Sequence, residues 1–406
     1  MKILFTLLTI IVFSNCQIIN YYRFNKAVQK EKIVQQTFLE DIPFREDKGF
    51  LIVKVLVNNK LEDFIFDTGA STILDENFAK TLKYKKNGHQ LHLDAMNNKQ
   101  ILKKIQLKNL AIGSINFKDI IANISNLDKL KKDVCLDVVG ILGRNVMNKA
   151  VWQIDYKRHV MTLTNSRDSL IQIANNQTFR FYSYKNGTPK IRLSIDSIFL
   201  GEAELDTGSN GGINLPKAHL PESLKSNNFI KLYGITNGLF SENLETAETT
   251  IIPHLKMGDS CEIKNALITY NSILPFALIG NRFLRDYIVT IDWQHQNISL
   301  ANFREDSDYL RNNFGFLPKF KEGKIIIGSI IENSDAFKAG LRLNDSILQL
   351  NQLDLRKATQ TDYCHLIENW FNNKYNQLEI IVLKNNKEVK YTLLKTNLIE
   401  TGVNKS

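Results

Sequence analysis

The sequence contains little cysteine and little proline, and it has no long hydrophobic run. It has 4 cysteines and 7 prolines among 406 residues. Apolar residues make up 43% and charged residues 23%, which excludes a disordered chain, a fibrous repeat and a polytopic membrane protein. A chain of this length can bury hydrophobic cores without disulfide bonds, and domains of ~100–200 residues predict two or three of them.

The cysteines and histidines form no metal-binding pattern. Cys135, Cys261 and Cys364 lack C-x-x-C spacing, and the 7 histidines include no H-E-x-x-H motif. We therefore expect no metal. Three cysteines cannot all pair with one another, so we interpret them as buried free thiols. A bridge between Cys135 and Cys261 is the alternative in an oxidising compartment.

The net charge of +10 is spread along the chain. Lysine-rich pieces such as residues 129–132 are typical of solvated loops, and aromatic residues are not interleaved with the basic ones. We therefore expect an ordinary basic surface and no nucleic-acid partner.

Residues 1–16 have the pattern of an export signal. One lysine precedes an apolar run over residues 3–13, which is shorter than the ~20 residues that a membrane-spanning helix needs. The run ends close to Cys16 and resembles the signal of bacterial lipoproteins, in which this cysteine is lipidated. Phe13 and Asn15 depart from that pattern, so a plain signal peptide and an uncleaved anchor remain alternatives. We expect a lipoprotein of the bacterial cell envelope, anchored to a membrane through Cys16, with a linker over residues 17–40.

An internal repeat of three short segments runs through the chain. The matched segments are 67–69 with 206–208, 140–143 with 277–280, and 151–155 with 288–292. The first pair is Asp-Thr-Gly in both copies, and the offsets between copies are 139, 137 and 137 positions. A nearly constant offset indicates two copies of one module, which we place at residues 41–165 and 166–304.

Both copies have the sequence pattern of β-strands. Residues 49–57 are rich in β-formers and end at a turn over residues 58–59, and hairpins are expected to turn at Gly113 and Gly258. Long helical periodicity is absent from residues 40–300. The predicted fold class is therefore mainly β, with an antiparallel pair of β modules.

The paired motifs resemble those of retropepsin-type aspartic proteases. In the viral members one module dimerises, whereas here two modules are fused in one chain, as in pepsin-like enzymes but with shorter halves. The resemblance covers about residues 40–300 and implies two tandem β-barrel modules related by a pseudo-twofold axis. It implies that Asp67 and Asp206 form the catalytic dyad of an endopeptidase without metal or cofactor. It also implies that Thr68 and Thr207 hydrogen-bond across the module interface.

The chemistry of such a dyad follows from its charges. Hydrolysis of an amide by water needs a base for the water and an acid for the carbonyl oxygen and leaving nitrogen. Two carboxyl groups about 3 Å apart share one proton, and the aspartic-protease dyad is itself the reference example of this effect. Gly69 and Gly208 let the backbone turn tightly beside each carboxylate. A lone Asp-Thr-Gly is often only a turn after a strand, and the matched pair argues against that alternative.

The two copies differ directly after the motif, where Ser209 replaces Ala70. A hydroxyl at this position can hydrogen-bond Asp206 and favour its ionised form, so we expect Asp206 to be the more readily ionised member. The second copy then departs further from the family pattern over residues 210–215. That departure, together with the C-terminal region, leaves open a catalytically inactive peptide-binding adaptor of the same fold. A second alternative is an inactive monomer that needs a partner, as single-module relatives do, and the two complete motifs argue against it.

A substrate flap is expected between each motif and the following glycine. The candidates are residues 92–100 and 232–240, with Met96 and Tyr233 as the flap residues. Flexible hairpin tips close over an extended peptide and exclude water. Plain exposed loops are the alternative.

Residues 314–395 resemble a PDZ domain of the bacterial kind. The resemblance rests on residues 336–341, on Asn344 and Asp345, and on a predicted helix over residues 361–371. It implies that a peptide is bound as an added strand at a sheet edge. It also implies that the loop of Phe314, Gly315 and Phe316 captures the carboxylate of a C-terminal peptide ligand, beside the protein or peptide substrate of the dyad. A domain that only packs or regulates access to the cleft is the alternative.

Overall fold

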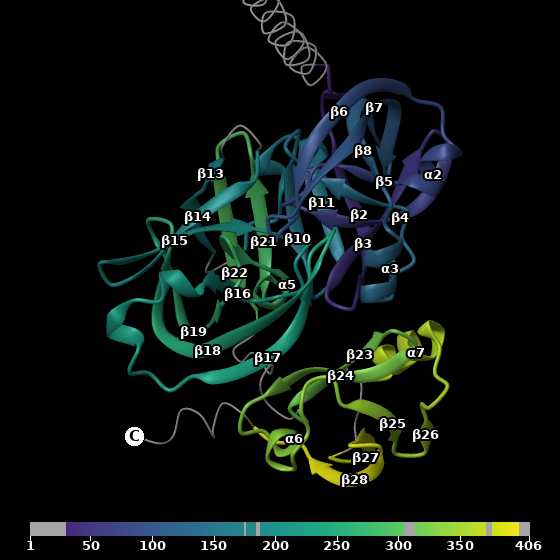
Figure 1. The fold of residues 1–406 in the computed structure, drawn as a ribbon. Coiled ribbons are helices and arrows are strands. Elements are labelled where there is room, and N and C mark those ends of the chain that lie inside the picture. Colours follow the sequence, from purple (N-terminus) through teal and green to yellow (C-terminus); the bar gives the residue numbers. More distant parts are fainter. Residues whose placement is uncertain (1–29, 174–175, 184–186, 304–312, 371–375, 398–406) are drawn as a thin grey trace, which may run out of the picture.

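The computed structural model describes residues 30–173, 176–183, 187–303, 313–370 and 376–397. The expected signal, with Cys16, and the first part of the expected linker lie outside these residues. Figure 1 shows two β-rich lobes side by side and a smaller domain below them. We call them the first lobe (residues 30–164), the second lobe (177–302) and the C-terminal domain (313–397). Within the described part, no helix is long and apolar enough to cross a membrane.

The first lobe is built on hairpins around strand β4 (Lys60–Asp67). Strand β3 (Phe50–Val57) turns into β4 through Asn58 and Asn59, whose φ values of 47° and 68° suit asparagine in a tight hairpin. Strand β4 then pairs in parallel with β9 (Gly140–Gly143), so Asp67 lies beside Gly143. The other elements of this lobe are β1 (Lys32–Ile33), β2 (Leu39–Asp47), β5 (Ile73–Asp75), α2 (Glu76–Lys80), β6 (Lys85–Leu93), β7 (Lys99–Ile112), β8 (Ile115–Ser125), α3 (Asp128–Val134), α4 (Arg144–Met147), β10 (Val151–Asp155) and β11 (Val160–Thr164).

The second lobe repeats these pairings. Strand β15 (Ile198–Leu205) runs parallel to β20 (Ala277–Ile279), as β4 runs parallel to β9. Strand β16 (Ile213–Pro216) is antiparallel to β20 and parallel to β19 (Cys261–Asn271), just as β5 lies between β9 and β8. The remaining elements of this lobe are β12 (Gln177–Arg180), β13 (Tyr182–Ser183), β14 (Pro189–Ile195), β17 (Ile230–Asn237), β18 (Glu242–Met257), α5 (Asn281–Leu284), β21 (Tyr287–Asp292) and β22 (Asn297–Asn302).

A shared sheet joins the two lobes. Strands β10 and β21 pair antiparallel along five residues, with Gln153 opposite Thr290, and the sheet order is β12-β22-β21-β10-β11-β2. The side chains of Gln153 and Thr290 are also hydrogen-bonded at 3.1 Å. The two copies of the repeated segment are therefore adjacent strands of this sheet. Their pairing fixes the relative orientation of the lobes.

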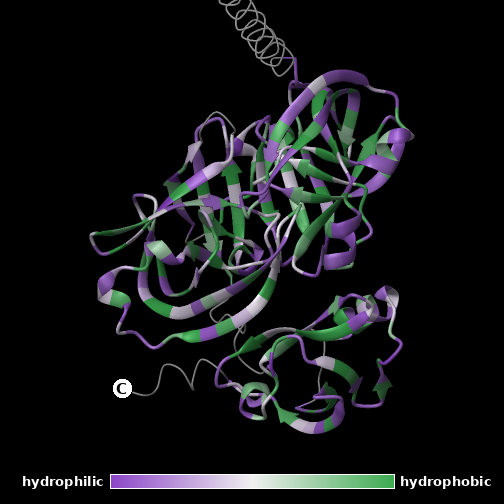
Figure 2. Cartoon of the chain, viewed as in Figure 1, coloured by the Kyte–Doolittle hydropathy of each residue, from purple (hydrophilic) through white to green (hydrophobic). Residues whose placement is uncertain are grey.

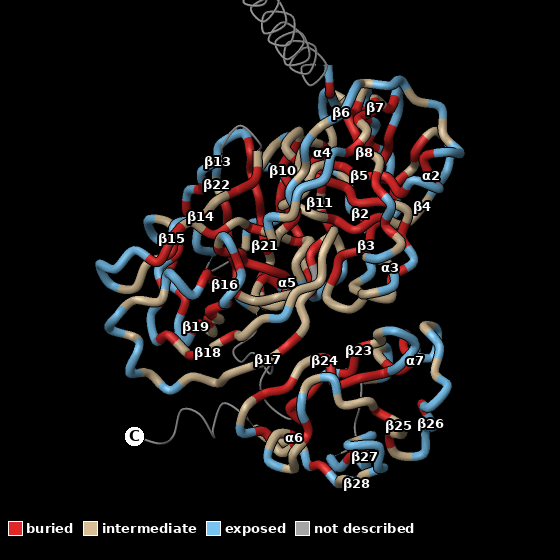
Figure 3. The backbone as a smooth tube through the Cα atoms, in the orientation of Figure 1, coloured by how far each residue is buried: buried red, intermediate tan, exposed pale blue. Residues whose placement is uncertain are grey.

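One hydrophobic core extends through both lobes, and a separate one fills the C-terminal domain. Figure 2 shows hydrophobic residues along the strands that meet between the lobes and hydrophilic residues along much of the β6–β7 hairpin. Figure 3 shows the same division as buried strands inside and exposed loops outside. The mainly β prediction is confirmed, including the hairpin turns at Gly113 and Gly258, whose φ values are 55° and 63°.

The C-terminal domain is a small sheet flanked by helices. Its long helix α7 (Gln360–Trp370) agrees with the predicted helix. The other elements are β23 (Phe316–Lys321), β24 (Lys324–Ile331), α6 (Asp335–Lys338), β25 (Ser346–Leu350), β26 (Leu353–Asp354), β27 (Gln377–Lys384) and β28 (Lys387–Leu394). Strand β24 also pairs antiparallel with β17 of the second lobe, so the sheet continues from one body into the other.

The expectation of free thiols is wrong for two of the three cysteines. Cys135 and Cys364 form a disulfide across 229 positions of sequence, between the end of α3 and the middle of α7. Cys261 is free and buried, as expected, and its pairing with Cys135 does not occur. The spacing could not reveal the true pair because it joins surfaces of two different bodies.

The core between the lobes should be sensitive to Trp152. This side chain is 0% exposed, packs edge-on against Phe66 at 5.1 Å and donates from Nε1 to the Met147 carbonyl at 2.9 Å. Replacing Trp152 by alanine leaves a cavity and should lower the free energy of unfolding by about 3–5 kcal/mol. Urea unfolding followed by circular dichroism measures this loss. Leu39→Ala, at a position 57% exposed on β2, is the control and should change stability little. Equal losses of stability in both variants would contradict the role of Trp152 in the core.

Candidate active site

The two Asp-Thr-Gly loops meet at the interface between the lobes. Asp67 is the last residue of β4, and Asp206 directly follows β15. Each of these strands lies beside an apolar strand that ends in or before a glycine, namely β9 and β20. The predicted pair of carboxyl groups is therefore brought together by two strand ends of equivalent geometry.

Thr68 and Thr207 join the two loops by reciprocal hydrogen bonds. The Oγ1 of Thr207 accepts from the Thr68 N–H at 3.0 Å and donates to the Phe66 carbonyl at 2.9 Å. The Oγ1 of Thr68 accepts from the Thr207 N–H at 3.0 Å and donates to the Leu205 carbonyl at 2.5 Å. Both threonines are 0% exposed, so water cannot replace these bonds. The geometry is the one that the family resemblance implies for these two residues.

Each carboxyl group lies against the glycine of the opposite loop, and each affects the pKa of the other. The Oδ1 of Asp67 accepts from the N–H groups of Gly69 and Ala70, each at 2.8 Å, and the Oδ1 of Asp206 accepts from the Gly208 N–H at 2.9 Å. A Cβ on Gly69 would lie 2.8 Å from the Asp206 Oδ1, and a Cβ on Gly208 would overlap the Asp67 Oδ2. Only glycine therefore allows each loop to approach the opposite carboxyl group so closely.

The surroundings of the two carboxyl groups are unequal. Burial raises the pKa of Asp67, but two backbone N–H donors and the Arg144 guanidinium oppose that rise. Burial raises the pKa of Asp206 well above its ordinary value, and the Asp67 charge raises it further. Only the Gly208 N–H lowers the pKa of Asp206, while nearby Glu204 adds to the rise. The pair titrates as one unit, and the larger number of donors at Asp67 favours the charge on Asp67 and the proton on Asp206.

This order is the reverse of the one expected from Ser209. The Ser209 Oγ accepts a hydrogen bond from the Gly211 N–H at 3.3 Å, within its own turn. Among the described residues, no hydrogen bond joins the Ser209 hydroxyl to Asp206. The second loop consequently has one backbone donor at its carboxyl group, where the first loop has two.

Residues that follow the repeated glycines hold the two loops in place, and the sequence analysis did not single them out. The Oδ1 of Asn145 accepts from both the backbone N–H and the hydroxyl of Thr72, each at 2.9 Å. In the second lobe, Asn281 Nδ2 donates to the Thr207 carbonyl at 2.7 Å and to the Gly49 carbonyl at 2.8 Å. Arg144 donates to the Gly69 carbonyl. The available signal was the polar pair after each apolar-apolar-Gly.

The tips of two hairpins, one from each lobe, touch each other. The first flap is the β6–β7 hairpin and the second flap is the β17–β18 hairpin. Asp94, at the tip of the first, accepts from the Phe240 N–H at 3.1 Å and from the Ser241 hydroxyl at 3.2 Å of the second. Asn98 Nδ2 donates to the Ser241 Oγ at 2.7 Å. Met96 lies in the first tip as predicted, with its N–H bonded to Asp94 at 3.0 Å.

Tyr233 does not lie at a flap tip. It sits within β17 opposite Ile330 of β24, and its ring packs against the core of the C-terminal domain. Its hydroxyl is 3.5 Å from a Glu332 carboxylate oxygen. The second tip is formed instead by residues 238–241, where Leu239 and Phe240 pack against an apolar cluster of the first lobe. The prediction failed because the position of the turn depends on a strand from another body.

The loop of Phe314, Gly315 and Phe316 is largely internal. Both aromatic side chains are 4% exposed, and their rings lie 6.3 and 5.1 Å from that of Trp370. The Gly315 N–H is bonded to Asn313 Oδ1 at 2.8 Å, and the Gly315 carbonyl accepts from the Ile331 N–H. The φ of Gly315 is 83°, and a Cβ there would overlap Ser334. The two phenylalanines therefore serve the core of this domain.

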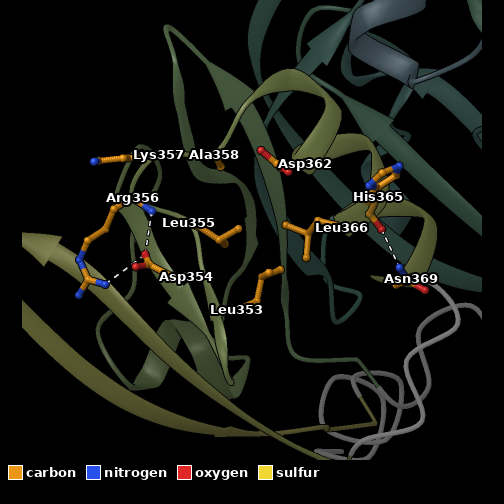
Figure 4. Close-up of a pocket in the computed structure, with 10 residues that line it drawn as sticks. All are labelled: Leu353, Asp354, Leu355, Arg356, Lys357, Ala358, Asp362, His365, Leu366 and Asn369. Atoms are coloured by element: carbon orange, nitrogen blue, oxygen red, sulfur yellow. Dashed lines mark hydrogen bonds and ion pairs between the residues drawn. The ribbon is translucent and has the colours of Figure 1, made fainter.

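A surface hollow lies elsewhere, between β26 and α7 (Figure 4). It is lined by residues 353–358, Asp362, His365, Leu366 and Asn369. Asp354 and Arg356 form an ion pair at its edge, 3.1 Å apart. No part of either Asp-Thr-Gly loop contributes to it, so it has no role in chemistry at the dyad. Among the described residues, no group of three or more His, Cys, Asp or Glu side chains is placed to hold a metal ion.

A comparison with known protein families supports the half of the site that contains Asp67. Residues 53–149 match the family model described as "gag-polyprotein putative aspartyl protease". The matched stretch contains Asp67, Thr68, Gly69, the first flap and the Gly143 strand, and it is similar to retropepsin-like aspartyl proteases. Asp206 lies beyond the match. No curated protein matches the chain.

The threonine pair generates a first prediction for the site. In Thr207→Val the Phe66 carbonyl and the Thr68 N–H both lose a buried partner, which should lower the free energy of unfolding by about 2–4 kcal/mol. Thr207→Ser keeps the hydroxyl and should lose less than about 1.5 kcal/mol. Urea titration of both variants measures the difference. Equal losses would show that the hydroxyl contributes nothing.

A second prediction concerns pH and Asp206. Because its folded pKa is raised, the carboxyl group contributes stability below its unfolded pKa and loses that contribution as pH rises through the folded pKa. Asp206→Asn removes the ionisation and should therefore raise Tm relative to the parent, increasingly so from acid towards neutral pH. Thermal scans across pH test this, with exposed Asp168→Asn as the control. A difference that shrinks as pH rises would contradict the proton assignment.

Proposed function

We propose that the chain is an aspartic endopeptidase that hydrolyses peptide bonds with a water molecule activated between Asp67 and Asp206. One observation carries this proposal: two buried carboxyl groups, each lying against the glycine of the opposite loop, on loops of the same sequence that buried threonines hold together. The match of residues 53–149 to an aspartyl protease family supports the same chemistry for the first loop.

In this mechanism the two carboxyl groups take different roles. Asp67, the charged member, removes a proton from the water as it attacks the peptide carbonyl carbon. Asp206 donates its proton to the carbonyl oxygen, so that a neutral tetrahedral intermediate forms without a covalent bond to the protein. The proton then held by Asp67 passes to the leaving nitrogen when the C–N bond breaks, and Asp206 recovers its proton from the intermediate. No metal or cofactor enters these steps.

The second half of the site is proposed as a second retropepsin-like module over residues 166–304, following a first over 41–165. Its support is the repeated strand pairing of β15, β16, β19 and β20. Because one chain supplies both carboxyl groups, the site is complete without a second subunit. The alternative of a monomer that needs a partner is therefore disfavoured.

Residues 314–395 are proposed as a PDZ domain that binds peptide or regulates access to the cleft. Strand β23 lies beside α7, with the rings of Phe320 and Tyr363 stacked at 6.2 Å. Among the described strands β23 pairs only with β24, so its other edge is the one at which a peptide would add as a strand. Because Phe314 and Phe316 are core residues, a peptide carboxylate would be held by the backbone of this loop and not by those side chains. Protein or peptide substrates and a C-terminal peptide ligand remain the proposed partners.

An exported, membrane-anchored lipoprotein is the proposed location, with lipidation at Cys16. The Cys135–Cys364 disulfide supports export, because such bonds form and persist in oxidising compartments and are rare in the cytosol.

Cleavage of a mixed peptide library tests the proposed activity. Incubation from about pH 3 to about pH 8, read by mass spectrometry, should give cuts with a bell-shaped pH dependence. Protonation of the singly charged pair sets the acid limb, and loss of its shared proton sets the basic limb. Both limbs should lie above those of ordinary carboxyl groups, since burial raises both pKa values.

Asp67→Asn and Asp206→Asn should each lower kcat by about 10³-fold or more, while the Asp168→Asn control should match the parent. Cuts that survive in either dyad variant, or that disappear with a chelator, would overturn the proposal. Tight peptide binding without any cleavage, unchanged by Asp206→Asn, would identify an inactive peptide-binding adaptor instead.

A further inference from the structure

A covalent bond ties the C-terminal domain to the first lobe. Cys135 ends α3 in a left-handed conformation, with φ 53°, and bonds to Cys364 of α7. Beside the disulfide, Gln360 Nε2 donates to the Lys132 carbonyl at 2.9 Å. Gln360 and Cys364 are one helical turn apart, so one face of α7 makes both contacts. Figure 1 shows α7 directly below α3.

The same domain also holds the second flap. Strand β24 pairs with the β17 arm of that flap through Leu232, Tyr233 and Gly234. Next to this pairing, the Glu332 N–H donates to the Lys231 carbonyl at 2.7 Å. The outer arm of the flap is therefore a strand of the C-terminal domain's own sheet.

Ion pairs fasten the other arm of the flap. Glu242, the first residue of β18 after the tip, lies 2.9 Å from Lys319 Nζ and 2.8 Å from Lys321 Nζ of β23. The Glu242 side chain is 26% exposed, and although burial opposes ionisation, the two lysines lower its pKa to about 2. These pairs therefore persist across the pH range in which carboxyl dyads work.

These contacts link the second flap to the first lobe in two ways, directly at its tip and indirectly through the C-terminal domain. The tip of the second flap is bonded to Asp94 of the first lobe. Its β17 arm pairs with β24 of the C-terminal domain, and Glu242 on its β18 arm forms ion pairs with β23 of that domain. The C-terminal domain is in turn bonded to α3 of the first lobe. Movement of the second flap away from the first lobe breaks the Asp94 bonds, and the C-terminal domain, which is paired with β17, must move with the flap. The disulfide opposes that movement.

We propose that the Cys135–Cys364 disulfide is a redox latch that holds the second flap closed across the cleft, and that its reduction by a dithiol frees the flap and raises peptide cleavage. The effect on cleavage rests on the proposed endopeptidase function. Both cysteine side chains are only partly buried, so a reductant can reach the bond. Cys261, free and buried, has a thiol pKa raised to about 12 and takes no part.

The dithiol supplies the electrons and the protons that reduce the Cys135–Cys364 disulfide. One thiolate of the reductant attacks a sulfur of the disulfide, a mixed disulfide forms, and the other cysteine leaves as a thiolate that takes up a proton. The second thiol of the reductant, as its thiolate, then attacks the mixed disulfide and releases the second cysteine. Two electrons and two protons pass to Cys135 and Cys364, and the reductant ends as a disulfide.

Hydrogen–deuterium exchange and peptide cleavage, measured on the full chain before and after dithiothreitol, test the latch. Reduction should raise amide exchange in β17, β24 and residues 238–241 and increase kcat/KM by about tenfold or more, a change of about 1.4 kcal/mol. Cys135→Ser and Cys364→Ser should show the reduced behaviour without reductant. Cys261→Ser, the matched control, should respond as the parent does.

Each outcome bears on one of the two proposals. Unchanged exchange in the flap after the bond is verified as broken, or a lower cleavage rate, overturns the latch. Raised exchange with no cleavage in either state supports the latch and overturns the endopeptidase assignment. If full reduction unfolds the chain, Cys135→Ser and Cys364→Ser, studied at a temperature where circular dichroism shows them folded, carry the test, because they remove the bond without a reductant. Flap exchange in these variants equal to that of the oxidised parent also overturns the latch.

Discussion

The reciprocal hydrogen bonds between Thr68 and Thr207 are the constraint on which the candidate site depends. Each hydroxyl both accepts from the opposite loop and donates back to a strand-end carbonyl, in a region without access to water. Breaking one of these bonds would leave two buried polar groups without a hydrogen-bond partner. The two loops therefore move as one unit. That rigidity keeps the carboxyl groups close enough for one proton to serve both.

The backbone of the site is nearly symmetric, but its electrostatics are not. Asp67 receives two backbone donors and lies near Arg144, whereas Asp206 receives one donor and lies near Glu204. The donors from Gly69 and Gly208 belong to the repeated Asp-Thr-Gly, whereas Ala70, Arg144 and Glu204 lie outside it. A duplicated module can therefore supply two equivalent positions for carboxyl groups, while residues that differ between the copies decide which one is the base and which one the acid.

Closure of the cleft couples all three parts of the molecule. The first flap belongs wholly to the first lobe, but the second is built into the sheet of the C-terminal domain by β24 and by the lysine pairs on Glu242. The first lobe contacts the C-terminal domain at α3 and the tip of the second flap at Asp94. The second flap therefore cannot move unless the C-terminal domain moves with it. The flap is therefore more restrained than an isolated hairpin.

Local sequence signals determined the strands, the hairpin turns at glycine, helix α7 and the two Asp-Thr-Gly loops, since each depends on neighbours within a few positions. The three matched segments at near-constant offset also indicated that the two aspartates lie together, because a repeated module places equivalent residues about one axis. Only the tertiary structure decided the pairing of Cys135 with Cys364, the place of Tyr233 against β24 and the proton on Asp206. These depend on which distant surfaces meet and how deeply charges are buried, and no short pattern in the sequence encodes either.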